Sequence, residues 1–326
     1  MRVHSLDDIT AWLRDKNDIA VITHKNPDGD AYGSALALVI ALRMLGKRAF
    51  PVCDDEVEPK FRFLPGWEEF TNEQKGLPFT PAYAFGVDVA DAGRMGRSEE
   101  LFNKCADTAV IDHHGTNEGF AACTYVEPEA AAAGQIILDL IHKLGLTLTL
   151  PLAECLYTAI STDSGNFSFK DTSAASFRAA AECMEAGIDI EMLTRRLYRS
   201  RTLAATRLLG AALDSFRVSK CGKAAGVMLT DEMFDASGAL RPEAHSIVNY
   251  MNEIQGVYVG MLAEQRGSDI KISFRGANDT DVSVLAKRFN GGGHFAAAGG
   301  TVYNAKLEGE FENILRACAE YVGDTL

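Results

Sequence analysis

The most constraining feature of the sequence is an apolar run, residues 19–22, that leads directly into a loop of metal-binding side-chain types. Within seven residues this loop carries the imidazole of His24 and the carboxylates of Asp28 and Asp30. A strand that ends in such a loop is typical of ligands at the carboxyl edge of a parallel sheet. The tight turn favoured by Pro27 and Gly29 would bring His24 and Asp28 to one ion and Asp30 to a neighbouring ion. The loop alone also fits a solvated turn in which Asp30 caps the next helix.

The same pattern recurs further along the chain. A predicted strand at residues 83–88 ends in Asp88, and another, starting at residue 108, runs into Asp112, His113 and His114. Asp163 closes a predicted helix that begins at Pro151. At the C-terminal end of a helix the dipole opposes a carboxylate, so Asp163 needs a compensating cation. Because parallel strands end at one edge of a sheet, these side chains are expected to lie together.

Hydrophobic periodicity assigns the elements around these loops. Helices are predicted at residues 5–14, 31–45, 130–144, 151–163 and 173–186, and strands at 19–23, 48–53, 83–88, 108–112 and 124–126. Helices that alternate with strands predict an α/β domain with a mainly parallel sheet.

A chain of 326 residues is long enough for two domains. A long helix is predicted at residues 190–216, and its five arginines would form either a solvated face or a connector lining a cleft. An α+β pattern follows, with strands at 224–229, 256–265 and 269–275 and helices at 242–251 and 282–289. The predicted organisation is therefore a domain at 1–190, a helical connector at 191–217 and a smaller α+β domain at 218–326.

Two other features suggest anion binding. Gly291, Gly292 and Gly293 precede His294 and a run of alanines, which predicts exposed backbone amides followed by a helix N-terminus. A flexible linker is the alternative interpretation. Arg94, which follows the strand ending in Asp88, would either contact a phosphate or cap a helix.

Composition excludes several functions. The net charge of -13 argues against binding long nucleic acid, so an anionic substrate should be short. Seven scattered cysteines without a CxxC pair indicate reduced core thiols and a cytoplasmic protein. The N-terminus lacks the apolar core of a signal peptide, and no apolar stretch approaches the roughly 20 residues of a membrane span.

The chemistry of the predicted ligands points to divalent cations. Carboxylates and imidazoles without thiolates suit manganese best, with magnesium, iron or cobalt as alternatives and structural zinc disfavoured. Several converging carboxylates would repel one another unless cations lie between them. Two neighbouring metal ions satisfy this requirement and are suited to phosphoryl hydrolysis.

With these motifs the chain resembles the DHH phosphoesterase superfamily, over nearly its whole length. The matching motifs are His24-x-x-x-Asp28-x-Asp30, Asp88, Asp112-His113-His114 and Asp163, and the loop from Gly291 to His294 resembles the DHH-associated C-terminal domain. The resemblance implies a DHH catalytic domain with a smaller substrate-binding domain across a cleft. Asp163-Ser164-Gly165 departs mildly from the more common Asp-Thr-Gly, since serine keeps a small hydroxyl.

The resemblance also implies roles for individual residues. It assigns one metal ion to His24 and Asp28 and the second to Asp30, His113 and Asp163, with Asp88 bridging them. Asp112 would orient an imidazole, and His114 would face the scissile phosphate, so that Asp88, Asp112 and His114 form the catalytic group. Arg275, Gly291, Gly292, Gly293 and His294 would hold a far phosphate or the terminal nucleotide.

Within the superfamily the chain closely resembles the small stand-alone bacterial enzymes that degrade short RNA and remove the 3'-phosphate of pAp (adenosine 3',5'-bisphosphate). The expected activity is hydrolysis of oligoribonucleotides of about two to five nucleotides and of pAp, in an enzyme expected to be a homodimer. The alternatives are linear or cyclic dinucleotides such as pApA and cyclic di-AMP, or pyrophosphate and polyphosphate. The glycine loop disfavours the pyrophosphatase branch. A non-enzymatic binding protein is also disfavoured, because no predicted ligand is missing.

Overall fold

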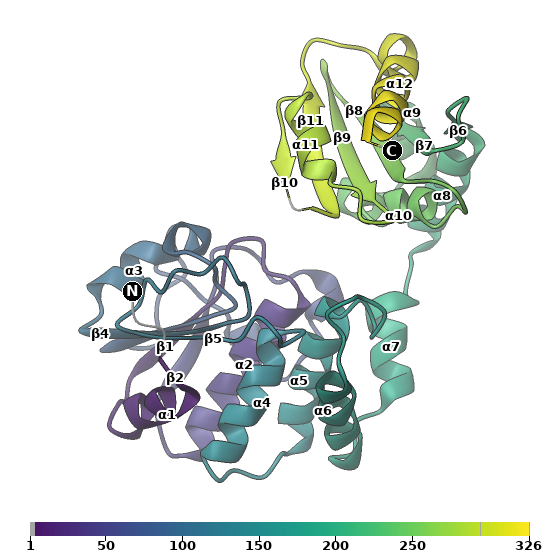
Figure 1. The fold of residues 1–326 in the computed structure, drawn as a ribbon. Helices are drawn as coiled ribbons and strands as arrows, with labels where there is room; N and C mark the ends of the chain where they lie inside the picture. Colours follow the sequence, from purple (N-terminus) through teal and green to yellow (C-terminus); the bar gives the residue numbers. More distant parts are fainter. Residues whose placement is uncertain (1–3, 294, 326) are drawn as a thin grey trace. The chain divides into compact units, whose positions relative to one another are not determined.

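The protein is described here from a computed structural model covering residues 4–293 and 295–325. The chain divides into two compact units, Met1–Ser200 and Arg201–Leu326 (Figure 1). The division falls inside the stretch predicted as a connector, and each unit has hydrophobic clusters of its own.

The first unit is built from five strands and seven α-helices in its described part. The strands are β1 (Ile19–Ile22), β2 (Ala49–Val52), β3 (Tyr83–Val87), β4 (Asp107–Asp112) and β5 (Cys123–Val126). The helices are α1 (Leu6–Arg14), α2 (Gly29–Met44), α3 (Ser98–Lys104), α4 (Ala133–Lys143), α5 (Leu150–Asp163), α6 (Ala174–Glu185) and α7 (Ile190–Tyr198), with short 3-10 helices η1 (Pro59–Phe61), η2 (Trp67–Glu69) and η3 (Ala92–Met95).

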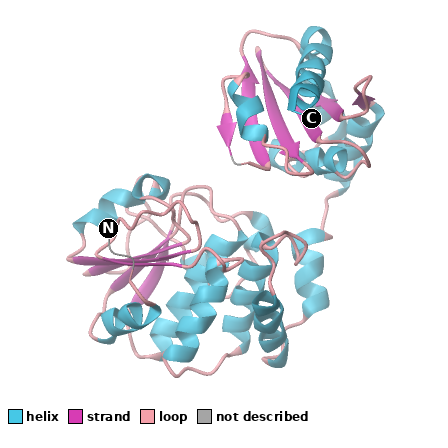
Figure 2. Ribbon diagram, in the orientation of Figure 1, coloured by secondary structure: helices cyan, strands magenta, loops and turns pink. Residues whose placement is uncertain are grey.

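The strands form one parallel sheet in the order β2-β1-β3-β4-β5. Successive residues of a strand face opposite sides, so Ile19 and Val21 pack against the helices α1, α2, α4 and α5. Ala20 and Ile22 pack on the other side against α3 and η3. Figures 1 and 2 show α1 on one side of the sheet and α3 on the other. The predicted α/β fold with a parallel sheet is confirmed, and its parallel strands all end at one edge.

The second unit contains a six-stranded mixed sheet in the order β10-β11-β9-β8-β7-β6. Its strands are β6 (Arg217–Val218), β7 (Ala224–Leu229), β8 (Val259–Arg266), β9 (Asp269–Gly276), β10 (Gly292–Gly293) and β11 (Ala297–Val302). Its helices are α8 (Leu203–Asp214), α9 (Asp231–Ser237), η4 (Arg241–Ala244), α10 (Ile247–Asn252), α11 (Val282–Lys287) and α12 (Leu307–Thr325). Helices α11 and α12 cover one face, and α8, α9 and α10 cover the other. This confirms the predicted α+β character of the C-terminal part.

The prediction of one helix at residues 190–216 is wrong. The structure has α7 and α8, separated by residues 199–202. Thr202 explains the break, because its backbone is extended and its hydroxyl accepts a hydrogen bond from the amide of Ala205 as an N-cap. The arginine run is therefore divided between the two units.

Two predictions in the second unit are also wrong. The helix predicted at 242–251 is split into η4 and α10. The alanines after the glycine run form strand β11 rather than a helix, and Gly292 and Gly293 pair with Gly299 and Ala298. The glycines have a packing reason, since a Cβ on Gly291 would lie 1.9 Å from the carbonyl oxygen of Gly299.

Most of the cysteines are buried, as predicted. The exceptions are Cys105, which is partly exposed, and Cys221, which is exposed. Among the described residues, every helix is too short or too polar to cross a bilayer.

Candidate metal centre

The predicted ligands of the first unit lie at the carboxyl ends of strands and at helix ends. His24 follows β1, Asp88 follows β3, and Asp112 ends β4, with His113 and His114 directly after it. Asp163 is the last residue of α5. Asp28 is the N-cap of α2, where its carboxylate accepts hydrogen bonds from the amides of Asp30 and Ala31, so Asp28 rather than Asp30 caps this helix.

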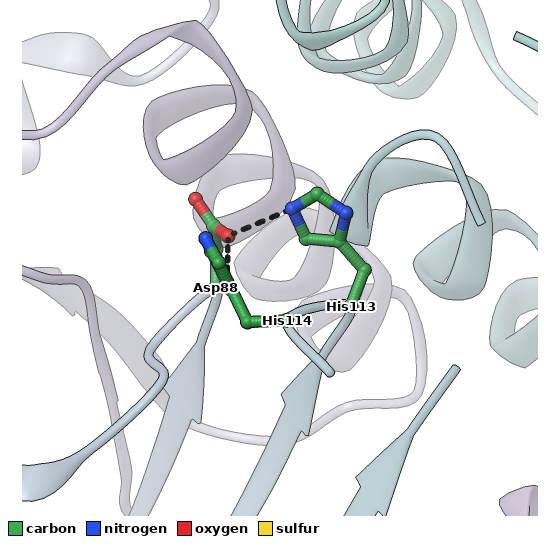
Figure 3. A group of neighbouring side chains, drawn as sticks. All are labelled: Asp88, His113 and His114. Atoms are coloured by element: carbon green, nitrogen blue, oxygen red, sulfur yellow. Dashed lines mark ion pairs between the residues drawn. The ribbon is translucent and has the colours of Figure 1, made fainter. Parts of the chain in front are cut away.

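These side chains form three overlapping sets of donor atoms, each set lying within 4.8 Å. The sets are His24, Asp28 and Asp88; then Asp30, His113 and Asp163; and then Asp88, His113 and His114. Asp88 connects them, because its Oδ2 lies 3.5 Å from His24 Nε2 while its Oδ1 lies 3.5 Å from His113 Nε2. Figure 3 shows Asp88 between His113 and His114, whose Nδ1 lies 3.6 Å from Asp88 Oδ1. The arrangement can therefore hold two cations with one carboxylate shared between them.

Backbone carbonyls fix the imidazoles of His24 and His113, whose Nε2 atoms face Asp88. His24 Nδ1 lies 2.9 Å from the carbonyl oxygen of Lys25, and His113 Nδ1 lies 3.2 Å from that of Ala130. A carbonyl only accepts hydrogen bonds, so Nδ1 carries the proton in the neutral imidazole. The lone pair of Nε2 in both rings is then directed at the shared centre, as in histidines that bind metal.

Asp30 lies in the first turn of α2 and is fully buried. Its carboxylate accepts hydrogen bonds from the amides of Ala133 and Gly134, at 2.6 and 2.9 Å, and from the hydroxyl of Ser34 at 2.6 Å. The two amides belong to the first turn of α4, whose dipole favours a negative charge. Asp30 therefore joins α2 to α4 and also faces His113 Nε2 at 3.9 Å.

Glycines let the helices that carry the carboxylates approach closely. A Cβ on Gly29 of α2 would lie 2.4 Å from Thr162 Oγ1, next to Asp163. A Cβ on Gly134 would lie 2.5 Å from the Cβ of Ala159 in α5. Helices without side chains at these positions pack closely enough to bring Asp30 and Asp163 to one place.

Asp88 has the environment expected of a metal ligand. Its side chain is 2% exposed, and its Oδ1 lacks a hydrogen-bond partner among the described residues. A buried oxygen without a partner is rare because it loses its hydration. The residue also has φ 57°, a left-handed backbone conformation that is uncommon outside glycine and concentrates at functional sites. The oxygen and nitrogen donors therefore fit divalent metal ions.

The titration of the cluster shows its excess of negative charge. Burial and the neighbouring Asp30 raise the pKa of Asp163 to about 9. Burial disfavours a charge on His24 and His113, yet their ion pairs with Asp88 raise the pKa to about 9 and about 10. Burial also opposes ionisation of Asp88, but the facing imidazoles of His113 and His24 hold the pKa of Asp88 below its usual range. Protons and divalent cations therefore compete for these side chains.

Asp112 has a different environment, because neighbouring groups use both of its oxygens. Oδ1 accepts hydrogen bonds from His114 Nδ1 at 2.7 Å and from the amide of His113 at 2.9 Å. Oδ2 accepts one from Asn117 Nδ2 at 2.8 Å. Sequence analysis gave Asn117 no role. Its place three residues after the Asp-His-His motif was the available signal.

Of the described residues predicted to bind substrate, Arg94 lies in the first unit and the others lie in the second. Arg94 lies in η3, its backbone carbonyl accepts a hydrogen bond from Lys25, and Asp91 caps the helix. Arg275 on β9 pairs with Ala297 of β11, which also pairs with the glycine strand β10. Arg275 and Gly291 to Gly293 therefore belong to one part of the C-terminal sheet. His294 lies outside the described residues.

Comparison with known families gives matches to both halves of the chain. Residues 18–160 match the model described as DHH family, N-terminal domain, and residues 224–324 match the DHHA1 domain. Over 304 residues the chain is 34% identical to a Thermus thermophilus protein named bifunctional oligoribonuclease and PAP phosphatase NrnA. That alignment covers 93% of this chain and 89% of the relative.

Two further similar proteins have names that indicate other activities than the name of the Thermus thermophilus protein. The crystal structure of an exopolyphosphatase-related protein from Bacteroides fragilis superimposes with a TM-score of 0.90 at 25% identity, covering 97% of this chain and 96% of that protein. The cyclic-di-AMP phosphodiesterase PdeA of Listeria monocytogenes is 24% identical over 96% of this chain, which spans only 49% of that protein.

Proposed function

Because the chain belongs to the DHH family of phosphoesterases, we propose that it hydrolyses short oligoribonucleotides of about two to five nucleotides to mononucleotides and removes the 3'-phosphate of pAp. The observation that carries the proposal is the shared position of Asp88 between His24 and His113. The likeness to the Thermus thermophilus protein supports the choice of substrate. The net charge of -13 fits a short substrate, which needs no long basic surface.

We propose that His24, Asp28 and Asp88 hold one divalent ion and that Asp88, Asp30, His113 and Asp163 hold the other. Manganese is preferred for this donor set, and magnesium, cobalt and iron are alternatives. When bound, such ions act as Lewis acids toward a phosphoryl group and make water a stronger nucleophile. Asp30 holds its carboxylate in place through the amides of α4, so the second donor set is preorganised before an ion binds.

His114 is the proposed donor to the phosphoryl group. Its Nδ1 donates to Asp112, which leaves Nε2 for the substrate, and its side chain is 34% exposed. The hydrogen bond to Asp112 raises the pKa of His114, so the ring carries a proton more readily. A protonated imidazole beside the reacting phosphate stabilises the negative charge that develops on its oxygens.

Arg275 and the glycine strand are the proposed site for a second phosphate of the substrate. Burial lowers the pKa of Arg275, and the described partners of its guanidinium are the uncharged Asn249 Oδ1 and the carbonyl of Phe274. A guanidinium without a carboxylate partner is free to bind a phosphate in two-point contact. Arg94 is a second proposed phosphate contact, because it forms no ion pair with the described residues.

The test is hydrolysis in the presence of Mn²⁺ across one substrate panel. It contains labelled RNAs from two to twenty-four nucleotides, pAp, pApA, cyclic di-AMP and polyphosphate. We expect rapid release of mononucleotides from the shortest RNAs, slower release as length increases, and phosphate release from pAp. A metal-free sample treated with EDTA is the control and should be inactive.

The second candidate activity is cleavage of linear or cyclic dinucleotides, which the likeness to the Listeria protein favours. Turnover confined to pApA or cyclic di-AMP would establish this reading and exclude the first. Turnover confined to polyphosphate would contradict both nucleotide readings.

A further inference from the structure

Asn117 contacts Asp112, one of the proposed catalytic residues, and its side chain is largely buried, with 8% of the residue exposed. Its Nδ2 donates hydrogen bonds to Asp112 Oδ2 at 2.8 Å and to the carbonyl oxygen of Val89 at 3.0 Å. Its Oδ1 accepts one from the amide of Gly119 at 2.8 Å. The three contacts use both N–H groups and the oxygen of the side-chain amide. They fix its orientation, because exchanging the oxygen and the nitrogen would lose all three hydrogen bonds.

The first consequence concerns Asp112, which is fully buried. Its Oδ1 accepts from His114 Nδ1 and from the amide of His113, so Oδ2 depends on Asn117 for its hydrogen bond. A buried carboxylate oxygen without a donor is costly. Asn117 therefore keeps Asp112 in the rotation that directs Oδ1 at His114.

The second consequence concerns the ring of His114. A carboxylate that faces Nδ1 stabilises the tautomer in which Nδ1 carries the proton. Nε2 then lies on the opposite side of the ring from Asp112, available to a ligand. If Asp112 turned away, the ring would lose its hydrogen-bond acceptor at 2.7 Å, because the other carboxylate oxygen near Nδ1, Asp88 Oδ1, is 3.6 Å away. The ring would then be less firmly oriented and would populate both tautomers.

The third consequence concerns Asp88. The carbonyl that Asn117 binds belongs to Val89, the residue after Asp88. The amide of Asp88 itself donates to the carbonyl of Ile111, one residue before Asp112. Asn117 therefore also ties the strained loop after β3 to the loop after β4, on which His113 and His114 lie.

We propose that Asn117 is a positioning residue that acts through Asp112 to fix the orientation and tautomer of His114. The inference rests on the proposed function and adds a residue outside the Asp-His-His motif. It predicts that loss of the Asn117 amide donor lowers the rate of reaction while metal binding and substrate affinity stay close to normal.

The experiment compares Asn117→Asp, which keeps the shape and loses the donor, with Asn117→Ala. The matched control is Asn72→Asp, because Asn72 is 5% exposed and, among the described residues, its side chain bonds only to backbone groups, including the carbonyl of Cys53. With pAp and Mn²⁺, both Asn117 variants should lose about 10-fold or more in kcat, with KM changed less than about threefold. Asn72→Asp should keep the wild-type kcat.

A second measurement does not depend on turnover. In the wild-type protein loaded with Mg²⁺, the imidazole ¹⁵N NMR signals of His114 should show one tautomer with the proton on Nδ1. In the folded Asn117 variants they should show a mixture of both tautomers. An unchanged kcat together with unchanged His114 signals in a folded variant would overturn the inference. If the wild type hydrolysed no nucleotide, the proposed function would fail, while the NMR comparison would still decide the role of Asn117.

Discussion

Asp88 is the residue on which the two proposed ion sites depend, since one of its carboxylate oxygens faces His24 and the other faces His113. We predict that Asp88→Asn prevents the paired binding of two ions and lowers kcat by more than about 100-fold, beyond the effect of an outer-sphere residue. Asparagine tolerates the left-handed backbone at this position, so the fold should survive.

Bound metal per chain, measured by elemental analysis, and far-UV circular dichroism check this prediction. Asp91→Asn is the control, because Asp91 is exposed and caps η3. Wild-type hydrolysis by a folded Asp88→Asn protein would contradict the two-ion proposal.

The pH dependence of the metal-free protein follows from His24 and His113. Their ion pairs with Asp88, acting against burial, raise the pKa of His24 to about 9 and of His113 to about 10 in the folded protein. The folded state therefore keeps protons that the unfolded state releases above about 6.5. The free energy of unfolding must then fall as pH rises from about 6.5 to 9. Asp163, whose pKa burial and Asp30 raise, changes stability in the same direction.

Urea denaturation of EDTA-treated protein at pH 6.5, 7.5 and 9 tests this expectation. The midpoint should decrease with pH, and adding Mn²⁺ should weaken or reverse the trend, because bound cations replace the protons. A midpoint that rose with pH in the metal-free protein would show that these histidines are not paired with carboxylates.

At the scale of elements, the approach of α4 to α5 depends on Gly134. A Cβ there would lie 2.5 Å from the Cβ of Ala159 and 3.2 Å from Ser34 Oγ, so Gly134→Ala should push α4 away from Asp30. We expect a loss of about 1–3 kcal/mol in the free energy of unfolding and weaker metal binding.

Gly210 in α8 provides the matched control, because its Cβ position has open space around it. Gly210→Ala should stabilise the protein by about 0.5–1 kcal/mol through helix propensity. Urea denaturation measures both variants. If Gly134→Ala were as stable as Gly210→Ala, the close packing of α4 would not constrain the site.

At the scale of the whole molecule, the two units have separate cores, and every donor set found among the described residues lies in the first unit. We therefore predict two thermal transitions. Saturating Mn²⁺ should raise the midpoint of one of them by about 5–10 °C, as expected for a ligand at about 100 times its Kd.

Fluorescence can identify that transition, because both tryptophans, Trp12 and Trp67, belong to the first unit. Calorimetry should show the shift, and tryptophan fluorescence should report the metal-sensitive transition alone. An equal shift of both transitions would show that the units unfold together.

The parallel sheet could be predicted from the sequence, because the period of its apolar residues and the polar loops after them are local properties of the chain. The same local pattern identified His24, Asp88 and Asp112 as strand-end residues, and the order of the motifs indicated the family. Short-range chemistry also placed the start of α1, where Ser5 and Asp8 form a capping box.

The contacts that hold the candidate ligands could not be predicted from the sequence, because they depend on the tertiary structure. The hydrogen bond between Asp30 and α4 forms because two helices approach each other closely, and the one between Asn117 and Asp112 depends on how the side chains are rotated. Local sequence patterns predict neither. The conformation of the glycine run was also not predictable from the sequence. The run at Gly291 to Gly293 suggested a loop before a helix, but contact with Gly299 across the sheet makes it a strand. A glycine permits many conformations, and its distant neighbours select among them.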